Sequence, residues 1–114
     1  MPAFFHEKSD LYRKALELAA AANQVAMSLP RERYYLKNQI WRCSLSVPCN
    51  IAEGLAARSI KTRLNYFAIS NGSAAECSAI FDAVVRFGLL PPEKLPYAIA
   101  REVGAMLSAS LRHR

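Results

Sequence analysis

The sequence lacks the features that mark several common classes of protein. Its three cysteines, Cys43, Cys49 and Cys77, form an odd set without Cys-x-x-Cys spacing, which argues against a disulfide framework and favours a reducing compartment. No run approaches the roughly 18 apolar residues that a membrane-spanning helix needs. The first ten residues, MPAFFHEKSD, do not show the basic segment followed by a long apolar segment that is typical of a signal peptide. We therefore expect a cytoplasmic protein without membrane association.

Residues that often carry catalysis or bind metals are also scarce. The only histidines, His6 and His113, lie outside the helix interiors expected below, so a carboxylate-and-histidine metal site is not supported. An activated thiol needs a neighbouring base, and we expect the cysteines to be buried and inert. Gly54 and Gly72 belong to no phosphate-binding GxxxxGK loop. These observations predict a protein that is not an enzyme and uses no cofactor.

The chain is long enough for a single domain. It has 114 residues, and we assign residues 1–114 to one domain. Hydrophobic residues make up 53% of the sequence, more than a lone small bundle should need, which points to contacts between subunits. The net charge is +6, and residues 31–63 hold seven Lys or Arg against Glu32 and Glu53. A basic balance of this kind favours anionic partners.

Apolar residues recur every three or four positions, which is typical of amphipathic helices. The expected helices span about 9–28, 31–57, 60–87 and 92–111. Four helices with short connections predict an all-α, antiparallel up-down-up-down bundle. The residues expected to face the core are Leu11, Ala15, Leu18, Ala22, Val25 and Leu29 of the first helix; Leu36, Ile40, Cys43, Val47, Ile51 and Leu55 of the second; Leu64, Phe67, Ser70 or Asn71, Ala74, Cys77, Ile80 or Phe81, and Val84 of the third; and Leu95, Ile99, Val103, Met106, Leu107 and Leu111 of the fourth.

Two residues oppose the helical pattern. Pro48 cannot donate to the carbonyl of Ser44, and a proline inside a helix costs about 3 kcal/mol. Because the apolar period continues past it, we expect a kink in the second helix and not a break. Gly72 costs about 1 kcal/mol relative to alanine in mid-helix, and we expect close packing to offset that cost. Ser59 is a suitable N-cap for the third helix, and Gly88 closes it.

Polar residues follow one line along each of the two middle helices. The lines comprise Gln39, Arg42, Ser46, Asn50 and Glu53, and then Arg63, Tyr66, Ser70, Ser73 and Glu76. One interpretation is a pair of solvated faces. The other is a partly buried network in which Asn50, Glu53, Ser73 and Glu76 meet between helices or between subunits. Buried polar groups of this kind need partners, so they would fix register and assembly.

The expected topology gathers basic residues at one end of the bundle. These candidate nucleic-acid contacts are Lys8, Arg13, Lys14, Arg58, Lys61, Arg63, Arg112 and Arg114. At the opposite end Arg31, Arg33 and Lys37 accompany Tyr34 and Tyr35. Positive charge beside aromatic rings favours the binding of single-stranded RNA or DNA. The sequence contains no helix-turn-helix or RNP1 motif, so sequence-specific recognition is not supported. The alternative is a protein-interaction scaffold whose charge is incidental.

One segment of the sequence resembles a known family. The string S-V-P-x-N-I-A-E-G, from Ser46 to Gly54 within QIWRCSLSVPCNIAEG, is similar to the four-helix bundle proteins first noted in intervening sequences of bacterial 23S ribosomal RNA genes. The accessory variability determinant of diversity-generating retroelements is a related member. The resemblance covers most of the chain and implies a cytosolic homopentamer. For the retroelement relatives it also implies a basic surface that binds RNA or DNA and a reverse transcriptase.

The resemblance assigns no catalytic residue to this chain. It carries over signature positions that we interpret as structural or assembly residues: Gln39, Ser46, Pro48, Asn50, Glu53, Gly54, Arg58, Ser59, Gly72, Ser73 and Glu76. The chain departs from the family pattern in several places. Trp41 replaces a usual basic residue, which weakens the nucleic-acid inference at that face. Cys43 and Ser44 replace two alanines, Leu64 replaces a common phenylalanine, and Thr62 leaves Ser59 without a capping-box glutamate.

Overall fold

The protein is all-helical over the residues that its structure, a computed structural model, describes, which are 9–112. Four α-helices follow one another and no strand occurs among these residues, as the periodicity predicted. The helices are α1 (Asp10–Ser28), α2 (Tyr34–Ala56), α3 (Ile60–Arg86) and α4 (Tyr97–Arg112), with short 3-10 helices η2 (Arg31–Arg33) and η3 (Pro92–Lys94) in two connections. Within this described range, every helix is too short or too polar to cross a membrane.

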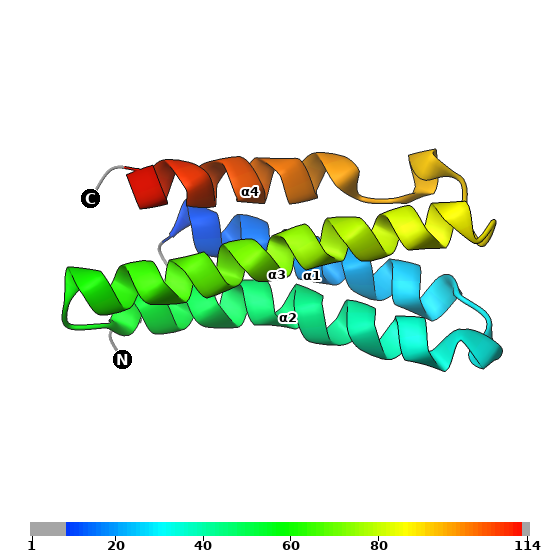
Figure 1. Ribbon diagram of the computed structural model, residues 1–114, viewed down its shortest axis with the longest axis horizontal. Coiled ribbons are helices and arrows are strands. Elements are labelled where there is room, and N and C mark those ends of the chain that lie inside the picture. The colour runs from blue at the N-terminus through cyan, green and yellow to red at the C-terminus, as the bar shows by residue number, and fades with distance from the viewer. Residues whose placement is uncertain (1–8, 113–114) are drawn as a thin grey trace.

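The helices lie side by side in an elongated molecule of 44 × 33 × 21 Å (Figure 1). Helix α2 packs against α1 and α3, and α4 packs against α3 and α1. The start of α1, the α2–α3 turn and the end of α4 lie at one end, which we call the terminal end (Figure 1). Residues 29–37 and 86–96, which comprise the other two connections and the adjoining ends of α2 and α3, lie at the opposite end, the loop end (Figure 1). The charged clusters described below occupy these two ends.

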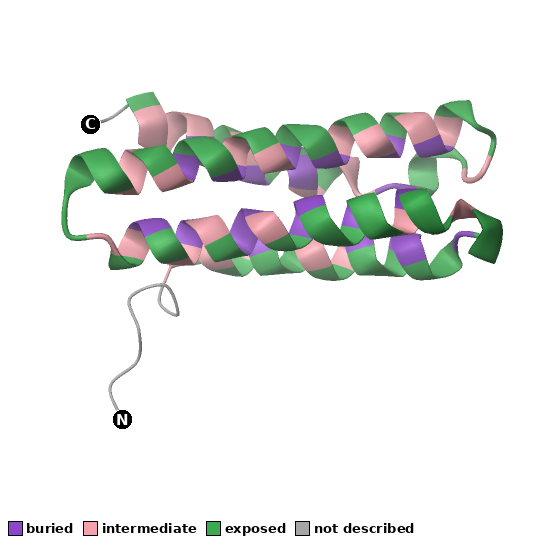
Figure 2. Cartoon of the chain, turned by 60° about the horizontal axis from the view of Figure 1, so that its bottom comes forward, coloured by how far each residue is buried: buried purple, intermediate pink, exposed green. Residues whose placement is uncertain are grey.

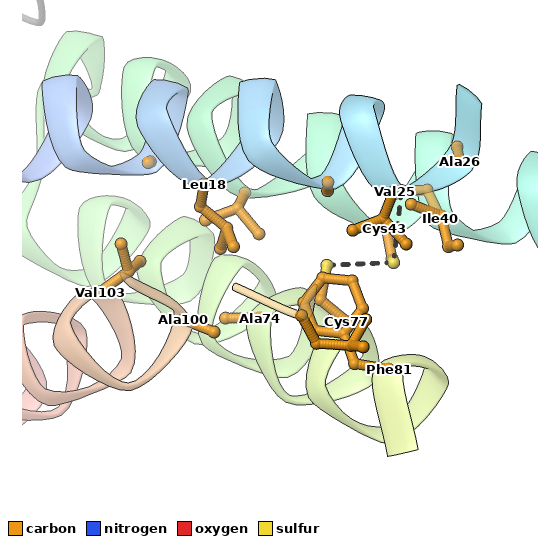
Figure 3. Packing of buried hydrophobic residues seen from close by; sticks show 14 of the residues in the cluster. Leu18, Val25, Ala26, Ile40, Cys43, Ala74, Cys77, Phe81, Ala100 and Val103 are labelled. Carbon is orange, nitrogen blue, oxygen red and sulfur yellow. Dashed lines mark hydrogen bonds between the residues drawn. The ribbon is translucent and has the colours of Figure 1, made fainter. Parts of the chain in front are cut away.

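The core is an apolar column between the inner faces of the helices (Figure 2). All six residues of the first helical region expected to face inward are buried. The expected positions of the other helices are buried or half-buried, and Phe81, Ile40 and Leu107 are among the largest that are fully enclosed. Figure 3 shows side chains from several helices meeting in this column. Burial of each such side chain stabilises the fold by about 1.5–3 kcal/mol, so the apolar periodicity accounts for the helix packing.

Helix α2 continues without a break through Pro48, which is fully buried. The expectation that the proline would not end the helix is therefore confirmed. One turn earlier, the hydroxyl of Ser44 donates to the carbonyl of Trp41 at 3.4 Å. From α3, the buried hydroxyl of Ser70 donates to the carbonyl of Val47 at 2.8 Å. This bond ties α3 to α2 directly beside the proline.

Two of the expected helix starts are wrong. Residues 31–33 form a 3-10 turn, and α2 begins at Tyr34. Helix α4 begins at Tyr97 instead of near residue 92, because Leu95 precedes Pro96 and is extended at φ −99° and ψ 141°. A residue before proline is driven out of the helical region by a clash with the ring. Pro92 therefore opens only the short turn η3.

The expected close packing at Gly72 is also wrong within this chain. A Cβ atom placed on Gly72 meets no heavy atom within 4 Å. The close approach lies at Gly54 instead, where a Cβ would come within 2.8 Å of two ring carbons of Phe67. The close packing of α2 against α3 therefore requires a glycine at position 54 and not at position 72. Gly88 closes α3 as expected, with φ at +73°.

Candidate functional site

The basic residues expected at the terminal end are partly neutralised by neighbouring acids. Arg13 pairs with Asp10, and Lys14 lies 3.8 Å from Glu17 and 3.3 Å from Glu102. Lys8 and Arg114 lie outside the described residues. Surface ion pairs add little stability, but they lower the charge available to an anionic ligand. The terminal end is therefore less basic than its count of lysines and arginines indicates.

Arg63, at the same end, hydrogen-bonds the C-terminus of α2. Its Nε donates to the carbonyl of Gly54 at 3.2 Å, and Nη2 donates to the carbonyl of Leu55 at 3.4 Å. The last carbonyls of a helix have no partner within it, so the guanidinium satisfies the end of α2. Arg58, Lys61 and Arg112 are exposed and join none of the ion pairs found among residues 9–112. These three are the cations of the terminal end that remain available.

The loop end combines cations with exposed aromatic rings. The guanidinium of Arg33 donates to the hydroxyl of Tyr35 at 3.2 Å and lies 6.0 Å from the centre of the Phe87 ring. The side chains of Tyr34, Tyr35 and Phe87 are 67%, 47% and 51% exposed. Rings with that much free surface are available for stacking. Sequence reasoning found the two tyrosines but missed Phe87, whose position directly after α3 and before Gly88 was the available signal.

The charge at the loop end is also less compensated. It holds five basic residues and two acidic ones: Arg31, Arg33, Lys37, Arg86 and Lys94 against Glu32 and Glu93. None of these seven takes part in an ion pair within the described part of the chain. Lys37 donates to the carbonyl of Leu29 at 3.1 Å, which orders the α1–α2 connection. The loop end therefore presents net positive charge beside three exposed rings.

Ser46, Asn50 and Ser73 form a polar cluster between α2 and α3. The hydroxyls of Ser46 and Ser73 are hydrogen-bonded at 2.8 Å, and the amide of Asn50 donates to the Ser46 hydroxyl and carbonyl, each at 2.9 Å. Glu53 and Glu76 are exposed and make no hydrogen bond or ion pair in the described region. Of the four residues expected to form a network, Asn50 and Ser73 are therefore linked, through Ser46, and the carboxylates of Glu53 and Glu76 lie outside it.

Three further signature positions have structural roles. Pro48 is buried within α2, and Gly54 is buried where α2 packs against Phe67 of α3. Ser59 caps α3: its hydroxyl accepts from the backbone N–H of Thr62 at 3.1 Å and donates to the Thr62 hydroxyl at 2.9 Å. Threonine thus makes a side-chain contact where a capping-box glutamate is absent. Gln39 is exposed on α2.

A pair of thiols lies behind the polar cluster. The sulfurs of Cys43 and Cys77 are 3.1 Å apart, and both residues are buried (Figure 3). The hydrogen bond from the Cys77 thiol lowers the pKa of Cys43, although burial and Glu76 act in the opposite direction. The same hydrogen bond, with burial, raises the pKa of Cys77. Cys49 is exposed, so the expectation that all three thiols are buried is wrong for that residue.

Cys43 also lines a small pocket. This hollow of about 330 Å³ is lined by Arg42, Cys43, Ser46, Ser73 and Glu76. Both cysteines were expected to face the core, but the sequence pattern does not show that two helices bring them together. Their pairing depends on the register of α2 against α3.

The fold and these sites define a small, basic, all-helical protein with cations and aromatic rings gathered at the ends of its helices. The family model of the 23S rRNA-intervening sequence protein matches residues 7–109, nearly the whole chain. The protein therefore belongs to the 23S rRNA-intervening sequence protein family, as the string from Ser46 to Gly54 indicated. A comparison with curated proteins finds no match.

Proposed function

We propose that this protein is a non-enzymatic, homo-oligomeric module that binds single-stranded RNA or DNA at its loop end. The observation that carries the proposal is the contact of Arg33 with both Tyr35 and Phe87, beside the exposed ring of Tyr34. A positive surface attracts the phosphate backbone, and exposed rings stack on bases of any sequence. The ligand class is therefore single-stranded nucleic acid without strong sequence preference.

The loop end is the preferred contact region because exposed aromatic rings accompany its cations, whereas cations of both ends make contacts within the chain. Three of the six described candidates at the terminal end, Arg13, Lys14 and Arg63, already have protein partners. The other three, Arg58, Lys61 and Arg112, are exposed. Within residues 9–112 none of them contacts an aromatic ring on which a base could also stack. We assign them a secondary role in attracting the polyanion over a longer range.

Assembly would strengthen this binding. We propose that the helices form an up-down-up-down bundle and that the chain assembles as a homopentamer, the state that the family resemblance implies. Exposed apolar side chains support an interface between copies, among them Leu45 at 57% and Ile69 at 52%. A ring of subunits would repeat each loop end around one rim and multiply its field. A reverse transcriptase is the candidate protein partner, which the neighbouring genes would reveal.

Assembly is tested by two substitutions on α2. Leu45→Glu places a charge on the proposed interface and should shift the mass measured by light scattering toward the monomer. Glu53→Ala removes an exposed carboxylate without a described intrachain partner, so a change in mass would assign that residue to assembly. Asn50→Ala should also disturb assembly, but it removes bonds of the polar cluster as well. A wild-type chain that is monomeric at high concentration would overturn the pentamer.

Nucleic-acid binding is tested by fluorescence anisotropy with mixed-sequence single-stranded RNA and DNA. If three to five phosphates are neutralised per site, the slope of log K against log salt should be about −2 to −3.5. Tyr34→Ala should weaken binding about tenfold, since stacking on one ring contributes about 1–3 kcal/mol per base. Arg33→Ala should weaken binding and also flatten the salt dependence by about one phosphate.

The matched control removes charge from the other end. The double variant Arg58→Ala, Lys61→Ala loses two exposed cations but no ring, and it should retain most of the affinity. A larger loss in this variant than in Arg33→Ala would move the site to the terminal end. Absence of binding at about 50 mM salt, with the oligomer intact, would remove the proposal. A defined, nuclease-insensitive protein partner would then favour the scaffold alternative.

A further inference from the structure

We propose that Cys43 and Cys77 form a reversible oxidation site, in which hydrogen peroxide converts the two thiols into an intramolecular disulfide that joins α2 to α3. The proposal does not depend on nucleic-acid binding. It stands on the position of two thiols in adjacent helices and on a pocket lined by one of the two cysteines.

The two sulfurs are already close to each other. The two sulfurs lie 3.1 Å apart, and they face each other across the α2–α3 contact (Figure 3). A disulfide bond is about 2.05 Å long, so the sulfurs need to approach by about 1 Å. Side-chain rotation and a small helix shift can supply a movement of that size. No other described thiol competes, because Cys49 lies exposed on the outer side of α2.

The pocket gives Cys43 the reacting role. Cys43 lines the 330 Å³ hollow together with Arg42, Ser46, Ser73 and Glu76. A hollow of this volume is large enough for hydrogen peroxide. Cys77 lines no part of that hollow and is fully buried. The lowered pKa of Cys43 favours its thiolate, the form that attacks peroxide. Cys77 is then positioned to react with the oxidised sulfur.

The chemistry has two balanced steps. The Cys43 thiolate attacks one oxygen of hydrogen peroxide, the O–O bond breaks, and Cys43 sulfenic acid and hydroxide form. The Cys77 sulfur then attacks the sulfenic sulfur; the S–S bond forms, the S–O bond breaks, and the Cys77 proton leaves with the hydroxyl as water. Peroxide is reduced, and the two thiols together lose two electrons. A thiol reductant restores both thiols by exchange.

The bridge would constrain the unfolded chain. The two cysteines are 34 residues apart, so the disulfide closes a loop of that length. A loop of this size, without native strain, should raise the unfolding temperature by about 10–20 °C. The increase should disappear on addition of reductant.

The experiment uses the full chain carrying Cys49→Ala, which removes the exposed thiol. After peroxide treatment the intact mass should fall by two hydrogen atoms, and both thiols should become unavailable to alkylation in denaturant until reductant is added. The matched variant, which also carries Cys77→Ala, cannot form the bridge. Its Cys43 should instead give a sulfenic acid that dimedone traps.

Two results would overturn the proposal. One is that Cys43 and Cys77 both remain alkylatable after a peroxide dose that fully oxidises Cys49 in the unsubstituted chain. The other is a disulfide found only between chains. If Cys77→Ala changes the fold, the circular dichroism spectrum shows it, and peptide mapping of the oxidised Cys49→Ala chain still decides whether the two cysteines are linked.

Discussion

Gly54→Ala is the substitution for which the structure makes the sharpest stability prediction. The added methyl group would lie 2.8 Å from Cδ1 and Cε1 of Phe67 and 3.1 Å from the backbone carbonyl oxygen of Arg63. Neither neighbour can yield easily, because Phe67 is 5% exposed and the carbonyl belongs to the helix backbone. Helices α2 and α3 must therefore separate locally by several tenths of an ångström.

The expected magnitude combines two opposing effects. Overpacking a filled contact costs about 1–3 kcal/mol. Replacing glycine by alanine inside a helix returns up to about 1 kcal/mol, and less near a helix end such as this one. We therefore expect the free energy of unfolding to fall by about 1–2 kcal/mol, equivalent to about 4–8 °C in the unfolding temperature.

Gly72→Ala is the matched control, since the same methyl group there meets no atom within 4 Å. It should raise the free energy of unfolding by about 0.5–1 kcal/mol through helix propensity alone. Urea unfolding at constant m-value measures both changes, and light scattering checks that the oligomer is unaltered. Two shifts of the same sign, with unchanged oligomer mass, would refute the argument from packing.

Three further predictions concern single contacts. Ser59→Ala should lower the free energy of unfolding by about 1 kcal/mol because α3 loses its N-cap, whereas Ser59→Asp should retain most of it; equal losses in urea unfolding would contradict this. Ser70→Ala should cost about 1–2 kcal/mol in the same assay, since a buried bond beside Pro48 is lost, and an unchanged midpoint would show the bond to be dispensable. Burial and the hydrogen bond to Asp82 raise the pKa of Tyr97 from 10.0 to about 12, so the neutral phenol stabilises the fold below pH 10 and that contribution is lost as pH rises toward 12. The tyrosinate absorbance that disappears in Tyr97→Phe should titrate near pH 12 and move to lower pH in Asp82→Ala, and a Tyr97 contribution that titrates near pH 10 would refute it.

Much of the fold was predictable because the apolar period is regular. The core positions of the first helical region, the caps at Ser59 and Gly88, and the continuity of α2 through Pro48 all follow from local rules. The start of α4 was misplaced because the effect of Pro96 on Leu95 outweighed the suitability of Pro92 for a first turn. The role expected of Gly72 belongs to Gly54, since only the relative placement of two helices decides which glycine faces a ring.

The candidate sites were less predictable because they depend on contacts between distant segments. The residues of the two basic clusters could be counted in the sequence. The ion pair that neutralises Lys14 could not be predicted in that way, because its partner Glu102 lies on α4 and Lys14 lies on α1. The contact of Arg33 with Phe87 joins residues on different helix ends in the same way. Such pairs raise or lower the charge and ring surface available to a ligand without any local sequence signal.

The sequence by itself determined the helical class, the buried face of each helix and the family, because these depend on residue spacing and on one continuous string from Ser46 to Gly54. The tertiary structure alone decided which cations remain available, which glycine is confined and which thiols meet. Those properties depend on the register and closeness of neighbouring helices. A shift of one turn would separate Cys43 from Cys77 and Ser46 from Ser73 while leaving the apolar period of each helix unchanged.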